Sequence, residues 1–404
     1  MSEESLDTKS FFSRWSFIWI LIFLVSLTFS TALMEISFVM AFLGWLALKI
    51  KKKTPLLLEW KTGLPLLGFV VLCVLSFFWS EFPKQSLRGA FKILKQFFLF
   101  WMVAETFSDP SRHRLAFRVL VVTFLVLALD GMMQYVLGFD LIRHIPFEPA
   151  SSGPRISATF KNYGLLASYL VTFLPILFSQ SDKNEGEKFS FKRMLAIAFG
   201  LLLLFWTRMR GAWLAFGCGL VFYLLFERKK IYLLLLVLIA LLGFFVLPRS
   251  MIVHLDAYGK EQSLVERFDL WERAIEVIRA RPLTGTGINT YAVAHQKFDT
   301  RKSWRVRNYY AHNGYLQIAA ETGLPSLLLF LIFVAMYFKK GCDSAIRLDE
   351  SSKRTLVGIL AGILNFLIYC LMDTVFHNPQ AVMGWWFLTG WGIAYQKIAS
   401  APRD

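Results

Sequence analysis

Long apolar segments separated by short polar ones dominate the chain. A hydrocarbon core about 30 Å thick needs about 20 mostly apolar residues for each helical crossing. The pattern therefore predicts an all-α integral membrane protein with about 12 transmembrane helices. The apolar segments lie at 15–33, 36–48, 63–80, 91–107, 115–137, 162–179, 194–207, 211–226, 231–247, 316–338, 355–372 and 380–396. Neighbours such as 194–207 and 211–226 could also form one broken helix.

Composition supports a single membrane domain over residues 1–404. Hydrophobic residues make up 56% of the chain, whereas soluble domains are about 45–50% apolar. The formal net charge of +16 could suggest nucleic-acid binding, but the basic residues lie in short clusters between apolar segments. That pattern is typical of loops that anchor a membrane protein, so we expect membrane lipids as partners and no nucleic acid. The first apolar segment lacks a small-residue cleavage site and is predicted to be retained.

The distribution of basic residues predicts which side each loop faces. The two tails and the loops 49–61, 105–118, 180–193, 227–230 and 339–354 carry 24 of the 44 Lys and Arg, and the short loops on the other face carry nine. By the positive-inside rule, both termini of this multi-pass protein are cytoplasmic. The rule does not apply to the long segment 248–315, because long loops cross the membrane regardless of their charge. From the order of the helices, this segment is predicted to be a periplasmic loop between the ninth and tenth helices. We therefore expect the protein in a bacterial inner membrane.

The long loop contains its own helical pattern. Apolar residues recur close to a 3.6-residue period over 263–281 and predict an amphipathic helix there. Ser263 and Glu266 resemble a capping box, and Pro282 ends the pattern. The segment TGTGINTY that follows is a Gly-rich turn. It is not a dinucleotide fingerprint, because no strand precedes it and the third glycine is missing.

Several arginines lie on the outward face against the topology rule. Ionisable residues at membrane depth are costly and mark functional sites, and guanidinium groups grip phosphate oxygens in a bidentate fork. The outward arginines are Arg88, Arg143, Arg155, Arg208, Arg210, Arg267, Arg273, Arg279 and Arg281. Together they predict a polyanion pocket at the outer membrane–water boundary. The alternative is that they extend to lipid headgroups, which we prefer for Lys92, Lys95, Arg143 and Arg279.

His312 is the second candidate, because it stands where the long loop re-enters the membrane in NYYAHNGYLQIAAETGLPSLL. A near-neutral histidine can take a proton from a hydroxyl without a metal. The alternative, a histidine that hydrogen-bonds to the backbone at the interface, is preferred for this residue taken alone. Nothing local favours His254, His295 or His377. No HxxxH or HExxH pair occurs, so no metal site is expected.

Four motifs resemble the O-antigen ligase family and occur along the chain in the order that the family has. This family shares its core with Wzy-type O-antigen polymerases and some protein O-glycosyltransferases. His312, ten residues and then Gly323 look like the family hallmark. RMRGAWLAF is similar to its short arginine turn and points to Arg210. RFDLWERAIEVIRARPLTGTGINTY resembles its periplasmic stretch and contains Arg267 and Trp271. SLRGAFKIL resembles the early loop that supplies a further basic residue, here Arg88, and Arg208, Arg155 and Asn313 are weaker candidates.

The resemblance covers roughly residues 80 to 340 and has two departures. Met209 stands where a small residue is usual before the arginine. The segment RISATFKNYGLLASYL follows the family pattern only loosely, which weakens any role for Asn162.

The resemblance implies a membrane-embedded glycosyltransferase that needs no metal and no cofactor. It would transfer an O-antigen glycan from undecaprenyl pyrophosphate to a sugar hydroxyl of the lipid A–core, on the periplasmic side, and complete lipopolysaccharide. His312 would act as the base. Arg88, Arg210 and Arg267 would stabilise the pyrophosphate leaving group, and displacement in one step would invert the anomeric centre.

Other functions remain open at this point. An O-antigen or other polysaccharide polymerase would use the same chemistry with a second lipid-linked glycan as acceptor. A transporter for a lipid-linked sugar would predict matching halves with interrupted helices, which are not evident in the sequence. A non-catalytic assembly subunit would have no need of His312 together with the arginines. The sequence does not specify the donor glycan, the acceptor position or the oligomeric state.

Overall fold

The structure is a computed structural model, and it describes residues 3–53, 63–149, 153–178, 191–232, 234, 262–298 and 310–400. Within these ranges the chain forms α-helices, short 3-10 helices and loops, with isolated bridges at Phe139–Pro146 and Glu148–Arg155 as its extended pairings. The predicted all-α class is therefore confirmed for the described part of the chain.

The helices follow one another as α1 (Glu3–Phe29), α2 (Thr31–Lys52), α3 (Gly63–Leu75), η1 (Ser76–Trp79), α4 (Pro83–Thr106), α5 (Pro110–Leu137), α6 (Tyr163–Leu177), α7 (Phe191–Trp206), α8 (Arg210–Phe226), α11 (Gln262–Ala280), α12 (Tyr291–Phe298), α13 (Gly314–Thr322), α14 (Leu324–Arg347), α15 (Glu350–Tyr369), η3 (Val375–His377) and α16 (Pro379–Ser400). The amphipathic helix predicted at 263–281 is confirmed as α11. The Gly-rich turn after it is confirmed as well, with Gly285 and Gly287 at φ +63° and +107°.

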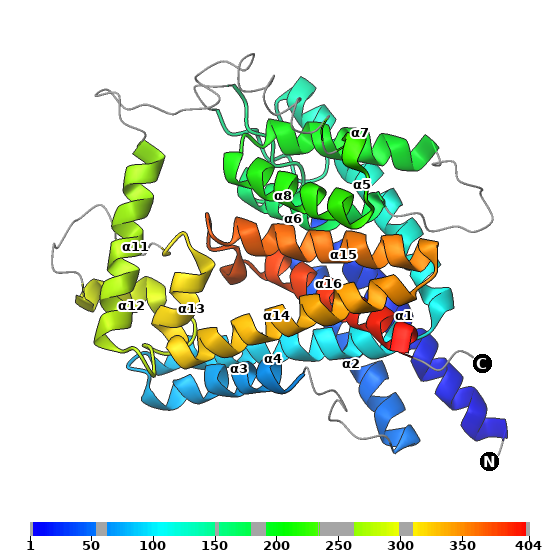
Figure 1. Ribbon diagram of the computed structural model, residues 1–404, viewed down its shortest axis with the longest axis horizontal. Coiled ribbons are helices and arrows are strands. Elements are labelled where there is room, and N and C mark those ends of the chain that lie inside the picture. The colour runs from blue at the N-terminus through cyan, green and yellow to red at the C-terminus, as the bar shows by residue number, and fades with distance from the viewer. Residues whose placement is uncertain are drawn as a thin grey trace.

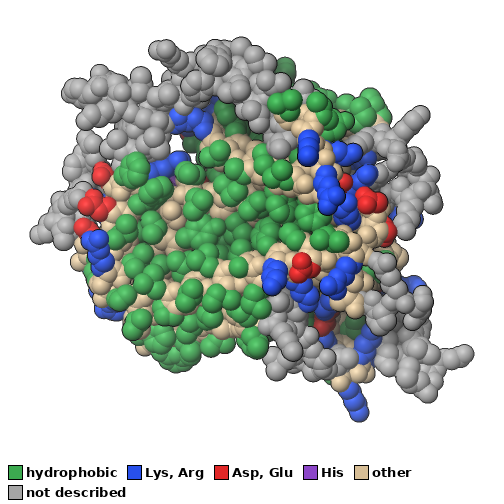
Figure 2. Space-filling view, viewed as in Figure 1, with side chains coloured by type: hydrophobic (Ala, Val, Ile, Leu, Met, Phe, Trp, Pro, Cys, Tyr) green, Lys and Arg blue, Asp and Glu red, His purple; other side chains and the backbone are tan. Residues whose placement is uncertain are grey.

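Five of the described helices are long and apolar enough to cross a membrane: Phe11–Phe29, Thr31–Lys52, Pro110–Leu137, Leu324–Arg347 and Glu350–Tyr369. Shorter apolar helices cover Gly63–Trp79, Tyr163–Leu177 and Arg210–Phe226. Figure 2 shows hydrophobic side chains over the middle of one face and charged side chains gathered toward its two ends. This distribution fits a membrane protein. The total of about 12 crossings and the place of the long loop stay predictions.

The structure shows where two of the predicted apolar regions are divided into separate helices. The segments 194–207 and 211–226 form two separate helices, α7 and α8, because a turn at 207–209 interrupts them. The apolar segment 316–338 is divided at Gly323, which has a φ of +84° that disfavours any residue with a side chain. The short helix α13 therefore precedes α14 as a separate element. The predicted helix at 231–247 lies almost wholly outside the described residues.

The bundle has two distinct ends (Figure 1). Helix α15 packs against α6 and α8 on one side and against α14 and α16 on the other, while α16 also packs against α4. Helices α11, α12 and α13 lie together at one end, and the start of α1 and the end of α16 lie at the opposite end (Figure 1). The predicted cytoplasmic termini and periplasmic long loop stay predictions.

Close helix approach holds the centre of the bundle together. A methyl group on Gly362 of α15 would lie 2.0 Å from the carbonyl oxygen of Thr172 in α6, and one on Gly390 of α16 would lie 2.4 Å from that of Phe100 in α4. Small residues permit such backbone contact between helices in a membrane, where packing has to replace the hydrophobic effect. These contacts join α15 to α6 and α16 to α4.

Candidate active site around His312

His312 lies in a tight turn directly before α13. Its φ is +46°, in the left-handed region. The side chain of Asn313 caps α13 by accepting hydrogen bonds from the backbone amides of Tyr315 (3.0 Å) and Leu316 (3.1 Å). The amide of Gly314 donates to the carbonyl oxygen of Cys370 at 2.7 Å. The turn is therefore fixed both to its own helix and to the end of α15.

Asp373 binds the imidazole of His312. The distance from His312 Nδ1 to Asp373 Oδ1 is 3.1 Å, and the same oxygen accepts from the amide of Thr374 at 2.7 Å. The side chains of His312 and Asp373 are 37% and 24% exposed. With Nδ1–H donating to the carboxylate, Nε2 carries the lone pair and can accept a proton from a hydroxyl group.

Trp271 of α11 contacts the same turn, because its indole Nε1 donates to the backbone oxygen of His312 at 3.4 Å. Arg267 precedes Trp271 by four residues, so both lie on one side of α11. The Arg267 guanidinium acts electrostatically on Tyr369, the last residue of α15. Helix α11 therefore brings the predicted Arg267 to the end of α15, beside the turn that carries His312.

Arg210 approaches from the turn between α7 and α8. It is the first residue of α8. A methyl group on the next residue, Gly211, would lie 3.2 Å from Cβ of Met372 and 3.7 Å from the ring of Tyr369. Since Met372 directly precedes Asp373, the start of α8 lies against the segment that binds His312.

Two further arginines, Arg208 and Arg155, lie in the loops that lead into α8 and α6. Arg208 lies over the ring of Phe205, and its Nε and Nη1 atoms are buried without a hydrogen-bond partner among the described residues. Arg155 donates from Nη1 to the hydroxyl of Tyr163 at 2.9 Å. A methyl group on the neighbouring Gly164 would lie 3.9 Å from Oδ2 of Asp373. A buried guanidinium without an acceptor is costly, so a bound anion would stabilise this region.

Arg88 lies elsewhere. It is on an exposed face of α4, and the adjacent Gly89 packs against Ile288 and Asn289 in the Gly-rich turn. Asn289 in turn donates its backbone amide to Glu321, at the other end of α13 from His312. A nine-residue helix is about 13 Å long. The structure therefore brings the helices and loops that carry Arg210, Arg267 and Arg155 to the segment beside His312. Arg208 precedes Arg210 by two residues, and Arg88 lies at the opposite end of α13.

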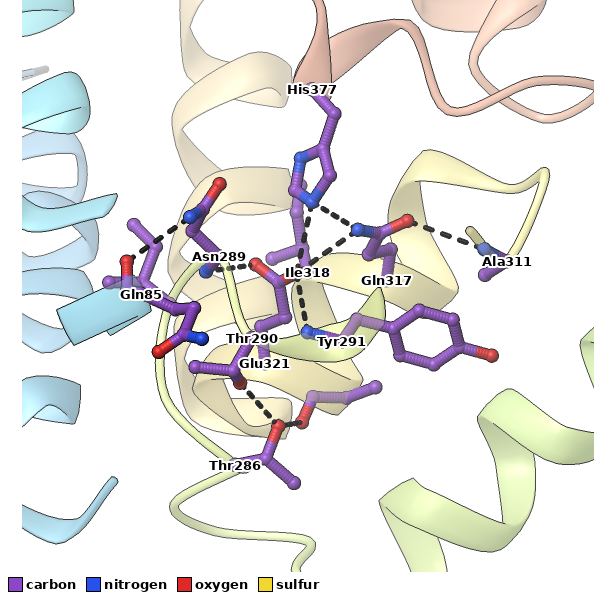
Figure 3. Close-up of polar contacts among 12 residues, drawn as sticks. Gln85, Thr286, Asn289, Thr290, Tyr291, Ala311, Gln317, Ile318, Glu321 and His377 are labelled. Carbon is purple, nitrogen blue, oxygen red and sulfur yellow. Dashed lines mark hydrogen bonds and ion pairs between the residues drawn. The ribbon is translucent and has the colours of Figure 1, made fainter. Parts of the chain in front are cut away.

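A second histidine–carboxylate pair occupies that opposite end (Figure 3). Glu321 accepts from His377 Nε2 at 3.0 Å, from Gln317 Nε2 at 3.0 Å, and from the amides of Asn289 at 2.6 Å and Tyr291 at 3.2 Å. Burial raises the pKa of the Glu321 carboxyl, but His377 and these hydrogen bonds outweigh burial and hold its pKa below the usual value. Glu321 is therefore ionised and enclosed.

Comparisons with known proteins bear on the family resemblance. Residues 195–331 match the family model described as O-antigen ligase. The resemblance to the O-antigen ligase family is thereby confirmed. The chain is also 24% identical over 332 residues to the exopolysaccharide production protein ExoQ of Rhizobium meliloti (strain 1021), which covers 74% of this chain and 70% of that protein. It is 23% identical over 239 residues to an uncharacterized protein of Haemophilus influenzae (strain ATCC 51907 / DSM 11121 / KW20 / Rd), over 53% of this chain and 59% of that protein.

The match to O-antigen ligase spans the arginine turn, α11, the Gly-rich turn and the His312 turn. Residues 195–331 are thus similar to that family, and the apolar helices fit a multi-pass membrane protein. Arg88, Arg155 and Asp373 lie outside the matched residues. The individual roles of the site residues stay predictions.

Sequence reasoning missed Asp373 and Glu321. Asp373 lies in CLMDTVFHNPQ, the short break between the last two apolar segments. The available signal was that this carboxylate lies in a predicted outward turn. That turn is on the same side as the loop that carries His312. Glu321 gave no such signal, because a single charge in an apolar segment does not reveal four separate hydrogen-bond partners. Among the described residues, no three His, Cys, Asp or Glu side chains gather as potential metal ligands.

Proposed function

We propose that the protein transfers a glycan from a polyprenyl pyrophosphate to a hydroxyl acceptor, with His312 as the general base. The observation that carries this proposal is the His312–Asp373 pair, bordered by arginines from the loop before α6, from the turn before α8 and from α11. A hydroxyl nucleophile needs a base, and a pyrophosphate leaving group needs positive charge as the glycosidic bond breaks. In this proposal His312 meets the first requirement and the arginines of the neighbouring helices meet the second.

The reaction would run in one displacement. His312 Nε2 takes the proton of the acceptor hydroxyl while its oxygen attacks the anomeric carbon, and the bond from that carbon to the pyrophosphate oxygen breaks. Asp373 holds the imidazole by Nδ1 and stabilises the imidazolium that forms. Arg210 and Arg267 stabilise the charge that develops on the pyrophosphate. Attack opposite the leaving group inverts the anomeric configuration.

The acceptor we propose is a sugar of the lipid A–core, so that the enzyme is an O-antigen ligase on the periplasmic face of the inner membrane. The family description supports this assignment. The second candidate is polymerisation of a polysaccharide on its lipid carrier. The likeness to a protein named for exopolysaccharide production favours it.

Deletion of the gene separates the two candidates. Loss of a ligase leaves full-length polysaccharide on its lipid carrier, whereas loss of a polymerase leaves single repeat units there. The deletion strain is then complemented with His312→Ala. A positioned general base contributes about 10²–10⁴-fold to a rate, so we expect this variant to restore no visible product at normal expression. A product ladder like that of the wild type would exclude His312 as the base.

A further inference from the structure

A cavity of about 150 Å³ lies between α2, α3, α4, α13, α14 and α16, next to the Gly-rich turn. Its inner wall is apolar and includes Phe69, Phe330, Val382 and Trp386. A dry cavity of about this size can hold a benzene-sized apolar group. The cavity is therefore suited to one segment of a hydrocarbon chain.

Charged side chains line part of the cavity: two carboxylates, two lysines and one histidine. Its two carboxylates already have cationic or imidazole partners, since Glu35 pairs with Lys95 and Glu321 with His377. Lys92 instead donates to the amide oxygen of Asn289 at 3.0 Å, and among the described residues it has no carboxylate partner. Glu321, Lys95 and, more weakly, Arg88 act electrostatically on Lys92. Arg88 lies one helical turn earlier on α4, just outside the cavity lining.

The rim also borders the surface that faces lipid. Ile36 and Val39, which follow Glu35 on α2, are 54% and 49% exposed. Phe91, which precedes Lys92 on α4, is 66% exposed. Exposed apolar side chains on both helices beside a charged rim indicate that a ligand enters from the bilayer and carries a charged group. Lys92 itself is exposed at this rim.

We propose that this cavity is a second substrate site, which takes one hydrocarbon chain of an anionic lipid and binds its phosphate at Lys92 and Arg88. An ammonium and a guanidinium side by side suit a phosphate group. The site lies at the Glu321 end of α13, about one helix length from His312. Identifying the lipid as the glycan acceptor rests on the proposed function, in which the donor pyrophosphate occupies the other end of α13.

The site can be tested by ligand binding without any transfer assay. The probe is dodecyl phosphate, added to the full-length protein in neutral dodecyl maltoside micelles. A ligand that binds the folded protein raises its Tm with concentration, so we expect a saturable rise for the wild type. Hydrogen bonds to charged groups predict that Lys92→Gln weakens the apparent affinity about tenfold or more. Lys92→Arg should retain most of it.

Two further variants locate the ligand. Val382→Trp fills the cavity and should abolish the rise in Tm. Lys84→Gln lies on the same helix but does not line the cavity, and it should bind like the wild type. If Val382→Trp does not fold, the comparison of Lys92→Gln with Lys84→Gln alone still decides the matter.

Three outcomes would overturn the proposal: no saturable rise in the wild type, equal binding by Lys92→Gln and Lys84→Gln, or loss of binding in Arg210→Ala but not in Lys92→Gln. The last would place the amphiphile at the His312 end instead. Binding should survive in His312→Ala. Because binding is measured apart from transfer, an active His312→Ala variant would refute the proposed function while leaving this site intact.

Discussion

The two ends of α13 carry the same pair of chemical groups in opposite order. At its start a histidine of the α13 turn meets Asp373 of the segment after α15, and at its end Glu321 of α13 meets His377 of that same segment. The pairs differ in exposure. The side chains of His312 and Asp373 are 37% and 24% exposed, whereas those of His377 and Glu321 are 19% and 5% exposed.

The difference indicates different tasks. The Glu321 carboxylate accepts four hydrogen bonds from three parts of the chain and is fully enclosed, which suits a structural contact that holds α13, the Gly-rich turn and η3 together. In the His312–Asp373 pair, Nε2 of His312 has no hydrogen-bond partner among the described residues, and the helices that carry Arg210 and Arg267 pack against the neighbouring segment. An exposed pair with an available nitrogen can react, whereas a buried and satisfied pair can only position. We expect substitutions at the two ends to affect different measurements.

The largest effect that tests this division is expected from Arg210→Ala. Loss of one charge-stabilising donor typically costs about 10²–10³-fold in rate, so transfer should fall by that amount while the protein still inserts into the membrane. Arg210→Lys should also be impaired, since a point charge does not replace the planar fork. The measurement is the transfer rate in membranes with protein quantified by immunoblot.

Arg279→Ala is a suitable control for Arg210, because Arg279 is exposed near the end of α11. It should transfer at close to the wild-type rate. Equal losses in both variants would mean that Arg210 merely anchors the protein.

A smaller effect is expected from Asp373→Asn. The amide can still contact His312 but cannot stabilise an imidazolium as a carboxylate does. Loss of such a supporting group typically costs about 10–100-fold, and the loss should appear in kcat with the donor KM nearly unchanged. Asp343→Asn, near the far end of α14, is the matched control. A wild-type kcat for Asp373→Asn would remove the carboxylate from the mechanism.

Arg88→Ala should affect transfer less than Arg210→Ala, because Arg88 lies at the other end of α13. Exposed charge pairs contribute on the order of 1 kcal/mol or less, which corresponds to a loss of about fivefold or less. We expect the loss in the KM for the lipid acceptor and not in kcat. A kcat loss as large as that of Arg210→Ala would show that the two ends of α13 act on one substrate.

Glu321→Gln should have its main effect on stability and its pH dependence. The pKa of Glu321 is lowered in the folded protein, so its contribution to stability is present above the unfolded pKa of about 4.5 and is lost as the pH falls below that value. At neutral pH the variant should lose about 1–3 kcal/mol. Between pH 6 and about pH 3.5 its Tm should fall less steeply than that of the wild type.

The exposed Glu350→Gln in the first turn of α15 serves as the control for Glu321. It should follow the wild-type curve. A Glu321→Gln curve parallel to the wild type would contradict the assigned ionised state.

Much of the fold could be predicted because apolar segments report directly on helices. The helix at α11 followed from its period, whereas the sequence left open whether 194–207 and 211–226 form one broken helix or the separate helices α7 and α8. The division of 316–338 could not be predicted from hydropathy, since Gly323 alone separates α13 from α14 and a single glycine in an apolar segment is common in membrane helices. Its positive φ becomes apparent only where Leu283 packs against it.

The candidate site was predictable where its residues are charged against the topology rule. Arg210 and Arg267 are among these outward arginines, His312 stood out by its place at the end of the long loop, and the family resemblance pointed to all three. The structure brings the elements that carry them to the end of α15. Sequence reasoning grouped Arg88 with them, because the sequence alone does not show that α13 separates Arg88 from His312. Asp373 and Glu321 were missed since their importance lies in partners that are distant along the chain.

The length of α13 has a consequence for how this protein can change. Each residue of an α-helix turns the chain by about 100° and advances it by about 1.5 Å. One residue inserted or deleted between Asn313 and Glu321 would rotate one histidine–carboxylate contact away while the other stayed in register. The segment should therefore tolerate many substitutions on its surface but no change in the number of its residues.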